Sequence, residues 1–143
     1  MREIKFRGKR VGNIWVYGDL VHIDKGYIII TSTNLTIDNS LSEGNALVYS
    51  EKEFSVVIPE TLGQFTGLTD KNGKEIYEGD IIQDNNGIGV IMWFQTSWGV
   101  ALYAYGYDGL KSYTAIDSFY VNEAKEWEII GNIHDNPELL NKD

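Results

Sequence analysis

The chain has no cysteine among its 143 residues. Disulfide bridges, thiol nucleophiles and cysteine-ligated metal sites are therefore excluded. A chain of this length buries about two-thirds of its unfolded surface, so it needs neither a cross-link nor a metal to fold. The lack of cysteine agrees with a reducing cytoplasm, where disulfides are rare.

Long apolar runs are also missing. No segment approaches the ~20 apolar residues of a membrane helix, and the start, Met1–Lys5, has no apolar signal-peptide core behind its charges. We therefore expect a soluble protein without a membrane partner. The sequence has no G-x-S-x-G elbow, no Walker-type phosphate loop and no dinucleotide fingerprint. We expect no catalytic residue, no cofactor and no metal ligand, and we interpret the protein as not being an enzyme.

Proline is scarce, with two residues, whereas there are 15 glycines, and Tyr, Trp and Phe make up 13% of the chain. Aromatic and β-branched residues separated by Gly, Asn and Asp are typical of short strands joined by tight turns. Three Asn-Gly or Asp-Gly dipeptides are the strongest hairpin signals. They lie at residues 72–73, 86–87 and 108–109. Near the end, Asn136 before Pro137 predicts the N-cap of a short helix.

These signals predict a mainly β fold with reversals every ~8–12 residues. We expect a single domain over residues 1–143, built from two small, intertwined antiparallel sheets or barrels. The first covers about residues 1–58; the second, residues 59–143, resembles an SH3-like barrel and ends in the short helix. Strands are expected at Glu3–Arg7 and Ile14–Ile23. The run Ile28–Ile30 is apolar throughout, so we expect it to be covered on both faces.

Positive charge gathers at the N-terminus, although the net charge of the chain is −9. Alternation over Glu3–Arg7 predicts a half-buried strand with a basic outer face. The candidate interaction residues are basic or aromatic: Arg2, Lys5, Arg7, Lys9, Trp15 and Tyr17. They could cradle single-stranded nucleic acid by charge and stacking. The favoured alternative is a basic strand that pairs with the acidic body or with a neighbouring subunit, because the acidic body repels phosphates.

Three other patterns have a chemical and a structural interpretation. The segment Asp70–Glu75 echoes a calcium loop, but its glycine comes too early, so a hairpin is favoured. Glu78 and Asp80 could form an acid–base pair, but a strand-entry turn in which Asp80 accepts backbone N–H groups is favoured. His22 and His134 lack the spacing of metal ligands and are interpreted as structural.

Three stretches of the chain resemble the YopX family of phage and prophage proteins. They are MREIKFRGKR at the start, IPETLGQFTGLTDKNGKEIYEGDII in the centre and EIIGNIHDNPELL near the end. The resemblance covers nearly the whole chain, and the segments around residues 32–55 and 98–122 have no matching motif. It implies a small, largely β protein of a bacteriophage or prophage, located in the cytoplasm of the bacterial host. It implies no catalytic residues, because the family has no established activity.

Three functions are compatible with these residues. We favour a non-enzymatic phage or prophage accessory protein that binds a host or phage protein, because the body is acidic and aromatic residues are in surplus. The alternatives are a small β-barrel that binds nucleic acid, and a carboxylate- or metal-dependent hydrolase that uses Glu78 and Asp80. We also expect a homo-oligomer, because a small core does not easily hide so many aromatic side chains.

Overall fold

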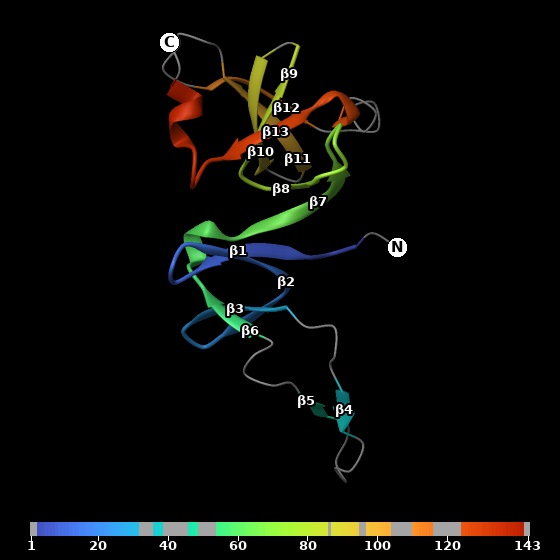
Figure 1. The fold of residues 1–143 in the computed structure, drawn as a ribbon, viewed down its shortest axis with the longest axis vertical. Helices are drawn as coiled ribbons and strands as arrows, with labels where there is room; N and C mark the ends of the chain where they lie inside the picture. Colours follow the sequence, from blue (N-terminus) through green and yellow to red (C-terminus); the bar gives the residue numbers. More distant parts are fainter. Residues whose placement is uncertain are drawn as a thin grey trace. The chain divides into compact units, whose positions relative to one another are not determined.

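Figure 1 shows the fold of the chain as a computed structural model. The residues described are 3–31, 36–38, 46–48, 54–85, 87–94, 97–103, 110–115 and 124–141. The chain divides into two compact units, one formed by Lys5–Leu62 and one that includes Gly63–Asp143. Within each unit the strands pair antiparallel.

The N-terminal unit is built on strands in the order β6-β3-β2-β1. Its elements are β1 (Phe6–Arg10), β2 (Ile14–Ile23), β3 (Gly26–Ile30), the ribbon strands β4 (Thr36–Asp38) and β5 (Ala46–Val48), β6 (Phe54–Val57) and the 3-10 helix η2 (Pro59–Thr61). Gly12 and Asn13, between β1 and β2, have φ angles of 92° and 63°. Tight hairpin loops use such left-handed conformations, which glycine and asparagine tolerate.

The core of this unit centres on β3. Ile28–Ile30 are all buried, which confirms that this run is covered on both faces. Val57 of β6 is also buried, and a Cβ added to Gly8 of β1 would approach the Val57 Cβ to 3.1 Å. The backbone N–H of Ile58 donates to the Lys9 carbonyl at 2.8 Å. The small residue at position 8 therefore lets the two outer strands of the unit approach each other closely.

The C-terminal unit combines a hairpin with a five-stranded sheet. The hairpin is β7 (Gly63–Thr69) and β8 (Glu75–Tyr77), and its turn contains Asn72-Gly73 as predicted. The sheet has the strand order β12-β11-β10-β9-β13. Its elements, with two 3-10 helices, are β9 (Asp80–Asp84), β10 (Gly87–Phe94), β11 (Ser97–Tyr103), β12 (Leu110–Ala115), η3 (Ala124–Glu126), β13 (Glu128–Asn132) and η4 (Pro137–Asn141).

The five-stranded sheet is buried on both of its faces. Consecutive side chains of a strand point to opposite sides, and Ile81 and Ile82 of β9 belong to separate clusters. The Ile82 cluster also contains Ile76, Ile91, Trp98, Val100, Ala124 and Trp127. The Ile81 cluster contains Ile88 and Val90 and is covered by residues that include Leu139 and Leu140 of η4. The short C-terminal helix is therefore part of the packing of this unit.

The prediction of a mainly β fold with antiparallel sheets is confirmed. Within the described residues, no sheet of either unit closes into a barrel. The two units divide after Leu62, whereas the sequence placed the division near residue 58. β1 begins at Phe6, later than the predicted Glu3. η4 begins at Pro137 as predicted but is a 3-10 helix. Asn136 Oδ1 turns back to accept the backbone N–H of Asn132 at 3.3 Å.

Candidate binding surface on the β1–β2 hairpin

The register of β1 and β2 brings most of the predicted interaction residues together. Arg7 lies directly opposite Tyr17, and Lys9 lies directly opposite Trp15. Residues that face each other across a strand pair share one side of the sheet, as do alternate residues of one strand. Arg7, Lys9, Trp15 and Tyr17 therefore form one cluster, which we call the hairpin face.

Trp15 holds both cations of the hairpin face. Arg7 Cζ lies 4.8 Å and Lys9 Nζ lies 5.2 Å from the centroid of the Trp15 ring. At such distances a cation is attracted by the negative face of an aromatic ring. Lys9 is fixed further, because its Nζ donates to Asn13 Oδ1 at 2.6 Å and its backbone N–H donates to Thr61 Oγ1 at 2.8 Å.

Arg7 and Lys9 are buried, with exposed fractions of 6% and 5%. The basic outer face predicted for Glu3–Arg7 is therefore wrong at Arg7, and the candidate interaction residue Lys9 is buried as well. The physical reason is their common contact with Trp15, since a charge tolerates burial when it is compensated locally. Lys5 is half-buried, and Arg2 lies outside the described residues. Tyr17 keeps 47% of its surface exposed.

The tip of the hairpin adds exposed apolar residues that the sequence analysis missed. Val11 is 88% exposed, and Ile14, which begins β2, is also exposed. Of the residues from 8 to 14, only Lys9 was predicted from the sequence as a candidate contact. The signal in the sequence is a valine directly before Gly12-Asn13, at a place where polar residues are usual.

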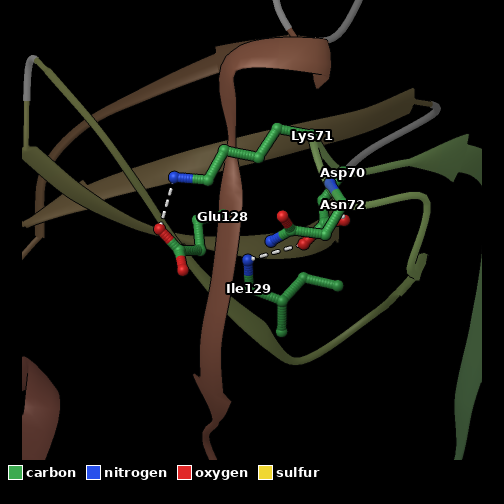
Figure 2. A network of polar contacts seen from close by, with 5 residues as sticks. All are labelled: Asp70, Lys71, Asn72, Glu128 and Ile129. Atoms are coloured by element: carbon green, nitrogen blue, oxygen red, sulfur yellow. Dashed lines mark hydrogen bonds and ion pairs between the residues drawn. The ribbon is translucent and has the colours of Figure 1, made fainter.

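The calcium-like pattern at Asp70 fastens two segments of the C-terminal unit together (Figure 2). Its Oδ1 accepts the backbone N–H groups of Asn72 and Lys74, each at 2.9 Å, and its Oδ2 accepts that of Ile129 at 3.1 Å. Burial raises the pKa of Asp70, but the N–H donors and the charge of Lys74 outweigh it and hold the pKa below its ordinary value of 3.8. The carboxylate shapes the hairpin turn, as predicted.

Lys71 joins the same two segments from the surface. Its backbone N–H donates to the Trp127 carbonyl at 2.9 Å, and its Nζ forms an ion pair with Glu128 (Figure 2). Both side chains of the ion pair are nearly half exposed. Exposed pairs contribute only ~0–1 kcal/mol, so the attachment depends mainly on Asp70 and on the backbone hydrogen bond.

The Glu78-Gly79-Asp80 turn is a second structural joint. The buried Asp80 carboxylate accepts the backbone N–H of Tyr77 at 2.8 Å, which confirms the predicted strand-entry turn. Gly79 has a φ of 85°, donates its N–H to the Ile91 carbonyl at 2.8 Å and accepts the N–H of Ile133 at 2.9 Å. The backbone uses the Asp80 carboxylate, and this reduces the support for an acid–base pair here.

The two histidines lie in different units. His22 of β2 packs on Tyr27 with ring centroids 4.9 Å apart, and the backbone N–H of His134 donates to Asn132 Oδ1 at 3.0 Å. In the part of the chain that the structure describes, no group of three or more His, Asp or Glu residues is arranged to hold a metal ion. No helix among these residues has the length and apolar character needed to cross a bilayer.

The family model described as YopX protein matches residues 5–141. The chain belongs to the YopX family. Among solved structures it is similar to the crystal structure of protein EF1440 from Enterococcus faecalis, with a TM-score of 0.62 and 23% sequence identity. The match covers 99% of this chain and 100% of that one, and at this identity it shows the fold alone. No curated protein matches the chain.

Proposed function

We propose that this chain is a non-enzymatic binding protein that engages another protein through the β1–β2 hairpin. The observation that supports the proposal is the combination of Val11, exposed at the tip, and Tyr17, exposed on the hairpin face, with cations held over Trp15. Aromatic residues are enriched in protein–protein interfaces, where a few anchors supply most of the affinity. Val11 at the tip and Tyr17 on the hairpin face are the proposed anchors.

The hairpin is well ordered for such a role. Continuous pairing from Phe6–Gly18 to Arg10–Ile14 fixes the two strands against each other. The bond from Lys9 Nζ to Asn13 fixes the loop from within. A surface that is ordered before binding loses less conformational freedom when the partner arrives. This order favours recognition of a partner by a defined surface.

Binding of nucleic acid is the less favoured alternative. Phosphate contacts need accessible cations, whereas Arg7 and Lys9 are buried against Trp15. The net charge of −9 also opposes a polyanion. The same charge favours a partner protein whose contact surface is neutral or basic. Membership of the YopX family supports a phage or prophage accessory role in the cytoplasm of a bacterial host.

Site-specific cross-linking tests the proposal. A photoreactive amino acid replaces Val11 in the full chain, and a matched variant carries it at Lys25, an exposed turn residue at the other end of β2. We expect a discrete protein adduct from position 11 but not from position 25, and we expect Tyr17→Ala to abolish it. Equal adducts from both positions would contradict the proposal. Salt-dependent binding of labelled single-stranded DNA by the same chain would favour the alternative.

We also propose that the chain forms homo-oligomers. Apolar side chains are exposed on both units, for example Val56 on one and Trp93 on the other, and exposed apolar surface promotes association. Sedimentation velocity at micromolar concentration tests this point. A strict monomer would remove the proposal of self-association without affecting that of a foreign partner.

A further inference from the structure

A pair of tryptophans in the C-terminal unit joins an exposed ring to a buried one. Trp93 of β10 and Trp98 of β11 lie directly opposite each other in the strand register. Their ring centroids are 4.9 Å apart and the rings meet edge to face, at an interplanar angle of 79°. Trp93 is 47% exposed, whereas Trp98 is 8% exposed and belongs to the core. A half-exposed indole therefore lies against a buried one.

The buried ring has an unused hydrogen-bond donor. Trp98 Nε1 is inaccessible to solvent and has no hydrogen-bond acceptor in the described part of the chain. An indole N–H can only donate, and a buried donor without an acceptor is unfavourable and uncommon. The neighbours of Trp98 in the core include Ile91, Val100 and Trp127, whose side chains offer no strong acceptor. An acceptor supplied by a ligand would relieve this cost.

We propose that Trp93 and Trp98 form a binding site for an extended, proline-containing segment of a partner protein. Such a segment adopts the polyproline II conformation, whose backbone carbonyls have no internal hydrogen bond. Aromatic-lined surfaces bind these segments because the conformation is already ordered. A proline ring packs on the Trp93 indole, and the adjacent carbonyl accepts the Trp98 Nε1–H.

Binding at Trp98 Nε1 requires a side-chain movement that uncovers this nitrogen. We expect Trp93 to be the side chain that moves, because its ring lies against Trp98 and is nearly half in water. The net charge of −9 adds a preference for lysine or arginine beside the prolines. The negative net charge also disfavours a nucleobase as the group that stacks on Trp93, because the phosphates of a nucleic acid would be repelled.

This site is independent of the proposed contact through the β1–β2 hairpin. It lies entirely within residues 63–143 and uses none of the residues of the β1–β2 hairpin. Failure of either proposal therefore leaves the other intact.

The indole N–H signals of the chain's four tryptophans allow a direct test. The nitrogen-15-labelled full chain is titrated with a proline-repeat peptide flanked by arginines, and separately with a peptide of equal charge in which glycine and serine replace proline. We expect the Trp98 signal to shift and saturate with the proline peptide only, while the signal of Trp15, which belongs to the other unit, stays in place. An unmoved Trp98 signal at millimolar peptide, or equal shifts with both peptides, would overturn the proposal. A response to oligothymidylate but not to the proline peptide would overturn it in favour of nucleic acid.

Two variants separate the roles of the rings. Trp98→Phe keeps an aromatic ring in the core but removes the donor, and we expect the Kd for the proline peptide to rise about tenfold, the effect of one ordinary hydrogen bond. Trp93→Ala leaves the core residue in place and should weaken binding at least as much, which keeps the test valid if Trp98→Phe does not fold. The matched control is Lys125→Ala, an exposed position in the same unit, which should bind as the wild type does. Wild-type affinity in Trp93→Ala would overturn the proposal.

Discussion

The backbone N–H of Ile129 donates a 3.1 Å hydrogen bond to the carboxylate of Asp70, which lies 59 positions earlier in the chain. The other carboxylate oxygen accepts N–H groups of Asn72 and Lys74 in the hairpin turn. One side chain therefore shapes a local turn and attaches it to β13. The stability of the C-terminal unit should depend on this carboxylate more than on the ion pair beside it.

Asp70→Asn should lower the free energy of unfolding by about 2–4 kcal/mol, because it removes the charge and aims an amide donor at backbone donors. Urea denaturation at neutral pH measures the change. The matched control is Lys71→Ala, which removes only the exposed ion pair with Glu128 and should cost less than about 1 kcal/mol. Equal losses in the two variants would show that the carboxylate has no special role.

The contribution of Asp70 should also depend on pH. Its pKa is below the ordinary value of 3.8 in the folded chain, so the unfolded chain takes up the proton more readily. The stabilisation is therefore complete above the unfolded pKa and is lost as the pH falls through the folded pKa. We expect the difference in unfolding free energy between wild type and Asp70→Asn to be constant down to about pH 5 and to shrink in more acid solution. A difference that does not change in acid would contradict the assignment.

Gly63→Ala should destabilise the C-terminal unit by about 1–3 kcal/mol through overcrowding. A Cβ at Gly63 would lie 2.6 Å from the backbone carbonyl oxygen of Glu78, and a backbone atom cannot turn aside as the end of a flexible side chain can. The control is Gly73→Asn, since Gly73 has a φ of 78° but no atom within 4 Å of an added Cβ, and asparagine tolerates this conformation. Thermal unfolding should show the larger loss in Gly63→Ala; a larger loss in Gly73→Asn would contradict the argument from crowding.

The contact between Arg7 and Trp15 should give a measurable coupling energy. A double-mutant cycle with Arg7→Met and Trp15→Leu should yield about 0.5–2 kcal/mol, the range for a partly desolvated cation and an aromatic ring. The control is a second cycle that combines Arg10→Met with Trp15→Leu. Arg10 is an exposed arginine that pairs with Ile14. Its coupling to Trp15 should be close to zero. The same value in both cycles would indicate a non-specific charge effect.

Local sequence signals predicted much of the fold. The bounds of β2 agree with the strand predicted at Ile14–Ile23, and Asn72-Gly73 forms a turn because glycine adopts positive φ at little cost. Asp80 likewise accepts a backbone N–H at a strand entry as expected. Each of these features is determined by residues that are close together in the sequence. The central stretch that resembles the YopX family contains many such turn and strand-entry signals.

The surfaces proposed for binding were less predictable. Arg7 and Lys9 are charged residues at alternate positions of the chain, a pattern typical of an exposed strand face. They are buried because the strand register places both near Trp15. Trp93 and Trp98 were not singled out from the sequence. Their pairing depends on the register between β10 and β11, and a composition rich in aromatics does not specify which rings meet.

The Asp70 loop also lies along one side of the five-stranded sheet. Among the described residues β13 is the last strand on that side, and an incoming strand would need the Ile129 N–H and the Trp127 carbonyl for its own ladder. Asp70 and Lys71 already occupy both groups. Open sheet edges invite further strands and lead to fibrillar aggregates. The hairpin turn thus protects this edge against the uncontrolled growth to which β-rich chains are prone.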